Sequence, residues 1–293
     1  MFLIAPYHAD VPFYRRPVAN YVLVAVTCAA FFVQFSLPKP VVESLMLQYW
    51  DLAGMVGYMF LHAGPMHLIG NMVFLVVFGN AVCAKVGNLA YVPLYFGLGL
   101  VAAAAHNLFS GGPAIGASGA INGIVGLFLV WYPNNQVRCF YLIFLLYFFR
   151  VGSFAVRSLW IIMLWVCFDV MGLLLSGGSV AYHAHLGGFA AGVGVASALL
   201  AAGLIRMDRG ERSLWARFGL GVGGRARGSE EELTPPTEEA RGPAAPGSPA
   251  QGAVPVMCAC GRRGRVPAAW AGRRIRCPKC GRTMRVPDEG PRV

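Results

Sequence analysis

Residues 116–132 read GASGAINGIVGLFLVWY and place one serine, Ser118, between small residues at the start of an apolar run. The run continues without a charged residue to Tyr132, as expected of a helix buried in protein or lipid. Residues 118–132 are fewer than the about 20 residues that a helix needs to cross ~30 Å of hydrocarbon. We therefore expect this helix to cross obliquely or to begin below one membrane surface, inside the protein.

The rest of the chain also has the composition of a membrane protein. Of its 293 residues, 57% are hydrophobic and 13% are charged, whereas a soluble domain is about 25% charged. This balance argues against an ordinary soluble enzyme. Together with 118–132, the other long apolar segments predict an all-α polytopic membrane protein with a bundle of six transmembrane helices. These other segments are residues 19–37, 66–84, 89–109, 157–175 and 182–205.

The basic residues indicate how the six helices are oriented. If the amino terminus is cytoplasmic, the outer segments contain a single basic residue, Lys39. The inner segments then contain Arg15, Arg16, Lys85, Arg138, Arg150, Arg157, Arg206, Arg209 and Arg212. The positive-inside rule therefore predicts a multi-pass protein of the cell membrane with both termini in the cytoplasm. Cytoplasmic loops and a basic tail account for the net charge of +11, which argues against nucleic acid as a partner.

Two further apolar stretches do not fit the pattern of spanning helices. Residues 139–149, CFYLIFLLYFF, are too short to span and lie between Arg138 and Arg150. We interpret them as an interfacial or re-entrant piece; if they spanned, the helix count would be seven. The outer loop, residues 38–65, is also rich in apolar residues, so we expect Tyr49 and Trp50 at the depth of the lipid headgroups.

Polar residues gather near the outer ends of three of the predicted helices. Ser118 opens one, HAGPMHLIGN (62–71) opens a second, and YHAHLGGFAAG (182–192) opens a third. A hydroxyl, an imidazole that can take its proton and donors for an oxyanion are the groups that nucleophilic acyl transfer needs. Ser118 and His185 form such a pair if their helices touch. Small residues favour this contact, because close backbone approach in lipid uses small-xxx-small faces, and the two helices carry Gly119, Gly123, Gly188 and Gly192.

The remaining polar residues have subsidiary roles in this interpretation. His67 and Asn71 are four residues apart on one helix face, and with the Ser118 N–H they can donate to an oxyanion. Asp169 lies midway along its segment, and we interpret it as a helix-packing group, since a serine–histidine dyad is chemically sufficient. His62 is interpreted as structural, and His183 faces about 200° away from His185 on a helix.

These motifs resemble those of the rhomboid intramembrane serine proteases. The resemblance rests on the G-x-S-G of 116–119, the A-H-x-x-G-x-x-x-G of 184–192 and the H-x4-H-x3-N of 62–71, and it covers about residues 15–205. It implies a rhomboid-like six-helix bundle in the lipid bilayer, with no cofactor for catalysis. Ser118 would be the nucleophile, His185 the general base and then acid, and His67 and Asn71 part of the oxyanion site. Substrates would be single-pass membrane proteins, cleaved in or near their transmembrane segments.

The chain departs from the family pattern at three positions. Asp51 follows Trp50 where many rhomboids have arginine, Cys83 stands four residues after Gly79 where many have glutamate, and Asn122 replaces an aromatic residue. These departures bring loop anchoring and pocket shape into question, and they leave room for an inactive scaffold that binds transmembrane helices. A transporter or channel is a second alternative, but it would need polar residues through the full membrane depth.

The carboxy-terminal residues form two further regions after the membrane domain, residues 1–207. Residues 208–252 are rich in Pro, Gly, Ala and Glu and predict a flexible cytosolic linker. Residues 253–293 carry Cys258, Cys260, Cys277 and Cys280. Two close cysteine pairs suit tetrahedral coordination of a structural zinc ion and resemble a small zinc ribbon. A redox pair or disulfides are alternatives, although a reducing cytoplasm disfavours disulfides, and the cytosolic partner of the ribbon stays open.

Overall fold

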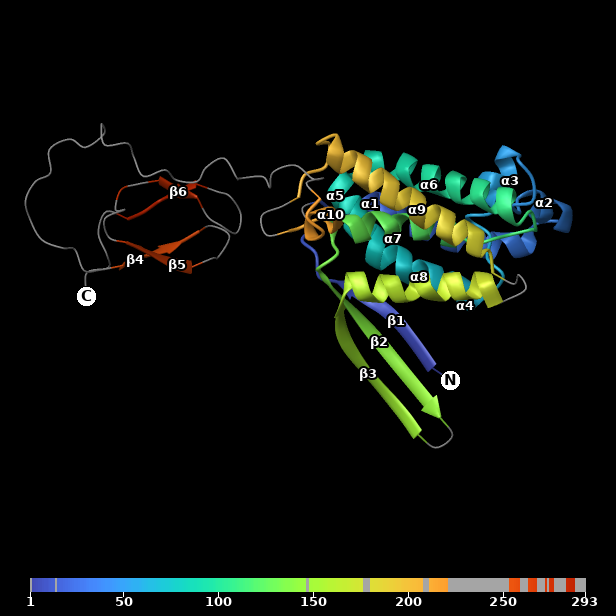
Figure 1. The fold of residues 1–293 in the computed structure, drawn as a ribbon, viewed down its shortest axis with the longest axis horizontal. Coiled ribbons are helices and arrows are strands. Elements are labelled where there is room, and N and C mark those ends of the chain that lie inside the picture. The colour runs from blue at the N-terminus through green and yellow to red at the C-terminus, as the bar shows by residue number, and fades with distance from the viewer. Residues whose placement is uncertain are drawn as a thin grey trace, which may run out of the picture. The chain divides into compact units, whose positions relative to one another are not determined.

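A computed structural model of the chain describes residues 2–13, 15–145, 148–175, 180–207 and 211–220, and shorter stretches near the carboxy terminus. Those stretches are residues 253–258, 263–267, 272, 274–276 and 283–287. The chain divides into two compact units, Met1–Glu231 and Glu232–Val293. Figure 1 shows the elements of the first unit. In chain order they are β1 (Phe2–Ala9), α1 (Val18–Val33), η1 (Gln34–Ser36), α2 (Lys39–Ser44), α3 (Leu52–Gly57), α4 (Pro65–Phe74), η2 (Leu75–Gly79), α5 (Asn80–Val86), α6 (Asn88–Phe109), α7 (Ser118–Trp131), β2 (Gln136–Leu145), β3 (Phe148–Arg157), α8 (Ser158–Leu175), α9 (Tyr182–Ala201) and α10 (Leu214–Arg217).

The first unit is a bundle of apolar helices, so the expectation of a multi-pass helical membrane protein is confirmed. Within the described residues, five helices are long and apolar enough to cross a membrane. They are Val18–Ser36, Pro65–Val86, Asn88–Phe109, Ser158–Leu175 and Tyr182–Ala201. The segment predicted at 118–132 forms α7, which has 14 residues. At 1.5 Å per residue this helix is about 21 Å long, too short to cross the hydrocarbon upright.

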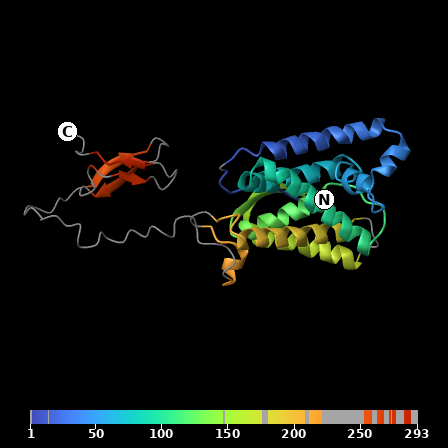
Figure 2. The same cartoon turned by 90° about the horizontal axis from the view of Figure 1, so that it is seen from above.

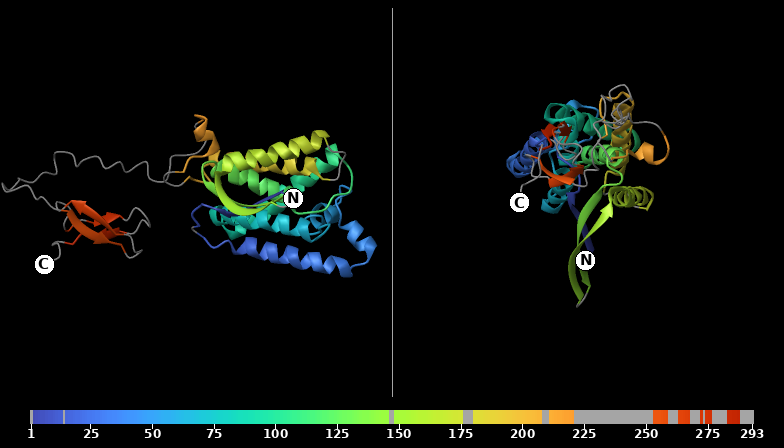
Figure 3. Two further views of the ribbon diagram at one scale, coloured as in Figure 1. Left: turned by 90° about the horizontal axis from the view of Figure 1, so that it is seen from below. Right: turned by 90° about the vertical axis from the view of Figure 1, so that its left-hand side faces the viewer.

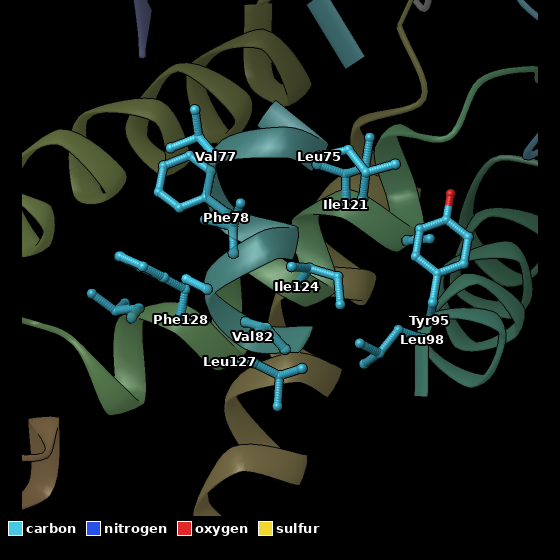
Figure 4. Close-up of a cluster of buried hydrophobic side chains, with 14 of the residues drawn as sticks. Leu75, Val77, Phe78, Val82, Tyr95, Leu98, Ile121, Ile124, Leu127 and Phe128 are labelled. Atoms are coloured by element: carbon cyan, nitrogen blue, oxygen red, sulfur yellow. The ribbon is translucent and has the colours of Figure 1, made fainter. Parts of the chain in front are cut away.

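Helix α7 lies in the interior of the bundle. Figure 2 shows it between α1 on one side and α8 and α9 on the other. Every α7 residue except Ser118 and Asn122 is buried. Its apolar side chains pack against α6 and against the turn that joins α4 to α5, as Figure 4 shows. The labelled members of this cluster are Leu75, Val77, Phe78, Val82, Tyr95, Leu98, Ile121, Ile124, Leu127 and Phe128.

A π-helical turn, η2, interrupts the long helix that runs from α4 into α5. Such a turn displaces backbone hydrogen bonds and leaves carbonyl groups that need other donors. The buried Asn20 side chain supplies one, because its Nδ2 donates to the Leu75 carbonyl oxygen at 2.9 Å. Asn20 also donates to Asn80 Oδ1 at 2.8 Å and accepts from the Tyr91 hydroxyl at 2.6 Å. A polar residue near the start of α1 thus joins three helices through satisfied hydrogen bonds.

The chain also contains a β-sheet, so the all-α prediction is wrong in this part. β1, β2 and β3 form an antiparallel sheet in the order β1-β2-β3, with Ile4 opposite Tyr141 and Ile143 opposite Arg150. The stretch 139–149, interpreted as interfacial or re-entrant, belongs to the β2–β3 hairpin. Aromatic and branched residues favour strands, and β1 supplies the third strand that an isolated hairpin needs for stability.

One face of the sheet packs against the bundle, and the other points away from it. Val137, Cys139 and Ala9 lie on the packed face near the bundle and are almost fully buried. The far end carries exposed apolar side chains such as Phe144 and Phe149. Viewed along the helices in the right panel of Figure 3, the sheet extends away from the bundle. The sheet therefore enlarges the apolar surface of the first unit beyond its helices.

Contacts between loops place several predicted inner segments at one end of the bundle. The Asn88 amide donates to the Arg16 carbonyl oxygen at 3.2 Å, and Lys85 Nζ lies 3.1 Å from Glu211 Oε2. Arg217 donates to Asn134 Oδ1 at 2.7 Å. These contacts link the loops that the charge pattern assigns to one membrane side.

The second unit contains short strands in the described residues. β4 (Ala253–Met257) pairs with β5 (Arg263–Pro267), and β6 (Arg274–Arg276) pairs with β7 (Thr283–Arg285), both antiparallel. Each pair is a separate two-stranded sheet. A two-stranded sheet is marginal by itself in water.

Candidate active site

Ser118 owes its position to the turn that precedes α7. Gly116 has φ +120°, a conformation that a side chain disfavours, and its N–H donates to the Tyr58 carbonyl oxygen at 2.8 Å. Ala117, which follows, is fully buried. The helix then begins at Ser118, so this residue lies at a helix start whose first N–H groups have no partner within the helix. The short length of α7 keeps this start inside the bundle.

Helices α7 and α9 touch along their backbones. A Cβ atom on Gly188 would collide with the Gly119 carbonyl oxygen, and one on Gly192 would collide with the Gly123 carbonyl oxygen. The small faces that the sequence analysis singled out therefore meet each other, as helix packing in lipid favours. Close approach of the two backbones places the side chains at the helix starts side by side.

Ser118 and His185 are brought together by this contact. His185 Nε2 lies 2.8 Å from Ser118 Oγ, a hydrogen-bond distance, and both residues are partly exposed. A neutral imidazole that accepts from the hydroxyl can take its proton during attack on a carbonyl carbon. The arrangement is therefore that of a nucleophile and its base.

Asp169 lies on the other side of the same imidazole, and the sequence analysis missed this contact. Asp169 Oδ1 is 3.1 Å from His185 Nδ1, and the two side chains are 19% and 14% exposed. The sequence predicts only a helix-packing role for this residue. A signal was present, because an ionisable group inside an apolar segment requires a partner. Sequence spacing could not show which helix face would meet α9.

His67 and Asn71 lie on one face of α4, opposite the turn that carries Gly116. The Ala63 N–H donates to His67 Nδ1 at 3.4 Å, so Nδ1 acts as acceptor and the ring proton belongs on Nε2. A Cβ atom on Gly116 would lie 2.8 Å from this Nε2 and 3.6 Å from Asn71 Nδ2. Both donors thus point at a space that stays open because residue 116 is a glycine.

Asn71 has a hydrogen-bonding group that the described residues leave unused. Its side chain is 8% exposed, and Nδ2 is buried without an acceptor among them. An unpaired buried donor is costly unless a ligand accepts from it. The amide is therefore suited to a substrate oxygen, together with His67 Nε2–H and the backbone N–H of Ser118.

A cavity of about 820 Å³ joins these groups. Its polar wall holds Ser118, His185, Asp169, His67 and Asn71, and its apolar wall includes Phe74, Trp165 and Phe168 from α4 and α8. Asn122, one turn after Ser118, also lines the cavity and donates to the Ser118 carbonyl oxygen at 3.0 Å. The two α7 residues that are not buried, Ser118 and Asn122, thus both line this cavity, together with the buried Ile121.

His62 lies behind His67 in the loop before α4. Its backbone exchanges two hydrogen bonds with the Gln34 side chain at 2.7 and 3.1 Å, and its ring contacts that of His67 with centroids 5.1 Å apart. The side chain is 1% exposed, and its Nδ1 lies 3.3 Å from the Phe60 carbonyl oxygen. These contacts agree with the structural role expected from the sequence.

Acidification is expected to weaken the fold through His62. Burial, and next the neighbouring His67, lower the pKa of His62 to about 4, against about 6.5 in an unfolded chain. The stabilisation from neutral His62 is therefore complete above pH 6.5 and is lost as pH falls toward 4. We expect the free energy of unfolding to decrease by about 3 kcal/mol across this window, measurable as a lower midpoint of thermal unfolding in detergent. The variant His62→Asn should have a flatter pH dependence, and an unchanged one would contradict the prediction.

Comparison with known proteins agrees with this geometry. Residues 47–202, more than half of the chain, match the Rhomboid domain family. The chain belongs to the rhomboid family. It is also 31% identical over 191 residues to Rhomboid protein 1, mitochondrial, of Saccharomyces cerevisiae, in a match that covers 59% of this chain and 51% of that protein. The chain thus spans about half the length of this curated relative, and the resemblance seen in the motifs is confirmed at the level of the family.

Two of the departures from the rhomboid pattern have a structural role in this chain. Asp51 caps α3, because its Oδ1 accepts from the Gly54 N–H at 2.7 Å. Cys83 is buried on α5, and its Sγ lies 3.3 Å from Asn88 Oδ1. Asp51 therefore anchors the outer loop by capping α3. Cys83 links α5 to the start of α6 through its contact with Asn88.

Two further histidines of this rhomboid, His183 and His106, make contacts with other residues. The His183 ring stacks on Phe109 with centroids 5.8 Å apart, which agrees with its predicted direction away from His185. His106 Nε2 lies 2.7 Å from the Gly112 carbonyl oxygen, so it holds the loop that borders the cavity. Among the described residues, His185 is thus the imidazole paired with the serine.

Of the four cysteines predicted to bind zinc, one lies in the described residues. Cys258 follows β4 directly and is 4% exposed. Cys260, Cys277 and Cys280 lie outside the described residues. Within the described part, no group of three or more His, Cys, Asp or Glu residues is arranged to hold a metal.

Proposed function

We propose that this rhomboid-family protein is an intramembrane serine endopeptidase that cleaves membrane proteins in or near their transmembrane segments. The observation that carries the proposal is the 2.8 Å contact between Ser118 Oγ and His185 Nε2 in a cavity lined by an unpaired amide donor. Family membership alone leaves room for an inactive member. The proposal therefore depends on the geometry of the side chains.

The first half of the reaction forms an acyl-enzyme. Ser118 Oγ attacks the carbonyl carbon of the scissile peptide while its proton passes to His185 Nε2. The negative charge on the carbonyl oxygen is stabilised by Asn71 Nδ2, His67 Nε2–H and the Ser118 N–H. When the C–N bond breaks, His185 returns the proton to the leaving amine.

The second half releases the product by hydrolysis. A water molecule entering the cavity loses a proton to His185 Nε2 and attacks the acyl carbon, and the ester bond to Ser118 Oγ then breaks. His185 returns the proton to that oxygen. The nucleophile, the base and the oxyanion donors in this scheme all come from residues of this chain.

The site also favours a particular kind of substrate and orientation. A regular helix shields its peptide bonds, so a substrate must present an extended or easily unwound segment to reach Ser118. Such a segment comes from a single-pass membrane protein lying against the bundle. The proposed location is the cell membrane, with both termini in the cytoplasm. The charge pattern supports this orientation, and the cavity would then open toward the opposite side.

Reaction with a fluorophosphonate tests the proposal without a known substrate. Such a probe forms a bond between phosphorus and an activated serine oxygen and releases fluoride. We expect wild-type protein in membranes to be labelled and Ser118→Ala to be unlabelled, because the nucleophile is missing. Labelling is measured by in-gel fluorescence or by the mass of the modified peptide.

A second serine of the cavity provides the matched control. Ser110 also lines the cavity, and Ser110→Ala should be labelled as strongly as wild type. If folded wild-type protein were not labelled, the protease proposal would fall and the scaffold that binds transmembrane helices would take its place.

We further propose that the carboxy-terminal unit is a zinc ribbon with a structural ion. Strand bounds support this, since Cys258 and Cys260 fall between β4 and β5, and Cys277 and Cys280 fall between β6 and β7. Thiolates offered in pairs from hairpin turns suit Zn²⁺. The ion would supply the folding free energy that two small sheets lack, and the unit would serve as a docking or regulatory module for a cytosolic protein.

Metal analysis of the full-length chain tests the ribbon. We expect about one zinc per chain by elemental mass spectrometry, from four thiolates around one ion. Cys280→Ser should lower this ratio severalfold, whereas Cys28→Ser, a change in α1, should leave it unchanged. Wild-type protein that is purified without chelators and contains no zinc would contradict the proposal.

A further inference from the structure

The acidic residue of α8 is unusual in its surroundings. Asp169 is the one Asp or Glu in the sequences of α1 and α4 to α9. A carboxylate at membrane depth is costly unless it has a partner or serves a function. Its side chain contacts His185, which in turn contacts Ser118.

The geometry joins Asp169, His185 and Ser118 in a line of hydrogen bonds. Asp169 Oδ1 lies 3.1 Å from His185 Nδ1, and His185 Nε2 lies 2.8 Å from Ser118 Oγ. All three residues line the same cavity, and the carboxylate and imidazole are mostly buried. The three side chains come from three helices, α8, α9 and α7, so their alignment depends on the packing of the bundle.

We propose that Asp169 is a positioning residue for catalysis, which extends the serine–histidine pair to a triad. This inference rests on the function proposed above. The carboxylate accepts the Nδ1 proton, so it selects the imidazole tautomer whose Nε2 is free to accept from Ser118. It also stabilises the imidazolium that forms when Ser118 gives up its proton. Asp169 itself keeps its charge and exchanges no proton.

The other groups around His185 cannot replace this carboxylate. His67 faces it from α4, and its Nδ1 already accepts from the Ala63 N–H, so it offers no negative charge and no acceptor to the His185 Nδ1 proton. The Tyr182 ring contacts it from α9 with centroids 6.2 Å apart. Ser118 approaches from α7. Among the described residues that face His185, Asp169 is therefore the one with a carboxylate that can accept the Nδ1 proton.

A purely structural role is the competing explanation, since Asp169 also connects α8 to α9. The two explanations differ in what they predict for reactivity at different pH. Loss of a structural contact lowers the folded fraction, and labelling decreases equally at all pH values. If Asp169 positions His185, its loss removes the preference for the Nδ1–H tautomer and the stabilisation of the imidazolium. The labelling rate of each folded molecule then decreases, most strongly near neutral pH.

The test measures the second-order rate of fluorophosphonate labelling per folded molecule between pH 6 and 10. For Asp169→Asn we expect a rate on the order of 10²–10⁴-fold below wild type near pH 7, with partial recovery at high pH. Asp169→Glu should retain more of the rate, because a carboxylate is still present. Asp51→Asn removes an acid that only caps α3 and should leave the pH profile of labelling unchanged.

The outcomes separate this proposal from the one on which it rests. Labelling of wild type that is lost in Ser118→Ala but unchanged in Asp169→Asn would overturn the triad and leave the protease intact. No labelling of folded wild type would remove the proposed function itself.

A measurement on wild-type protein covers the case in which the variants do not fold. With ¹⁵N-labelled histidine in detergent-solubilised protein, NMR should show His185 with its proton on Nδ1, assigned by comparison with His185→Gln. A neutral His185 with its proton on Nε2 would overturn the proposal.

Discussion

Gly192→Ala is expected to destabilise the bundle by about 3 kcal/mol or more and to lower fluorophosphonate labelling at least about 100-fold. The new Cβ atom would collide with the Gly123 carbonyl oxygen and lie 2.8 Å from its carbonyl carbon and 3.0 Å from its Cα. These are backbone atoms of α7, and they cannot turn aside as a side chain can. Helices α7 and α9 must therefore separate, which lengthens the contact between Ser118 and His185.

The same helix offers a control for this change. Gly194 lies two residues further along α9, and a Cβ atom there would have no atom within 4 Å. Gly194→Ala should be as stable as wild type or slightly more stable, since alanine favours a helix over glycine. Thermal unfolding and labelling rate are measured on both variants. Equal behaviour of the two would show that the backbone contact does not determine the geometry of the site.

Asn71→Ala is expected to lower the second-order rate of labelling by about 10²–10³-fold, the usual effect of removing one oxyanion donor. The phosphoryl oxygen of the probe takes the place of the substrate oxygen that Asn71 Nδ2 would bind. Because this donor has no partner among the described residues, its removal leaves no other group unpaired. Folding stability should therefore change little while reactivity falls.

An asparagine outside the cavity serves as the matched control. The Asn107 amide donates to the Tyr49 carbonyl oxygen at 3.0 Å, away from Ser118, and Asn107→Ala should react at close to the wild-type rate. A labelling rate for Asn71→Ala within about twofold of wild type would rule out the oxyanion role and leave the amide without a function.

The features that the sequence predicted well are those encoded locally. Hydropathy alone delimits the long helices, and the short run after Ser118 already indicated a helix that begins inside the protein. The glycines at 119, 123, 188 and 192 indicated the contact between α7 and α9, because faces of small residues allow two helix backbones to approach closely. From these two facts the proximity of Ser118 and His185 could be predicted without coordinates.

The sheet could not be predicted in the same way. Ile4 pairs with Tyr141, and a partner so distant along the chain leaves no periodic signal in either segment. The run 139–149 has aromatic and aliphatic residues on both faces, and Cys139 is buried against the bundle whereas Phe144 and Phe149 are exposed. Periodicity cannot distinguish such a strand from a short buried helix.

The role of Asp169 depended on an angle that the sequence does not contain. Position 169 could face lipid, α7 or α9 according to the rotation of α8 about its axis. Packing sets that rotation, and Trp165, one turn before Asp169, contacts Phe74 with ring centroids 4.6 Å apart. Once that face of α8 is turned inward, Asp169 follows it toward His185.

The pairing of β1 with β2 has a consequence for the order in which the protein folds. β1 is synthesised before helices α1 to α7. Ala9 of β1 can pair with Val137 of β2 only after all of these helices have been synthesised. At 5–20 residues per second the delay is on the order of ten seconds. During that time an apolar strand has unsatisfied backbone groups and can pair with another nascent chain. β1 leaves the ribosome before the other two strands of its sheet, so a membrane surface or a chaperone that covers it would prevent such pairing during biogenesis.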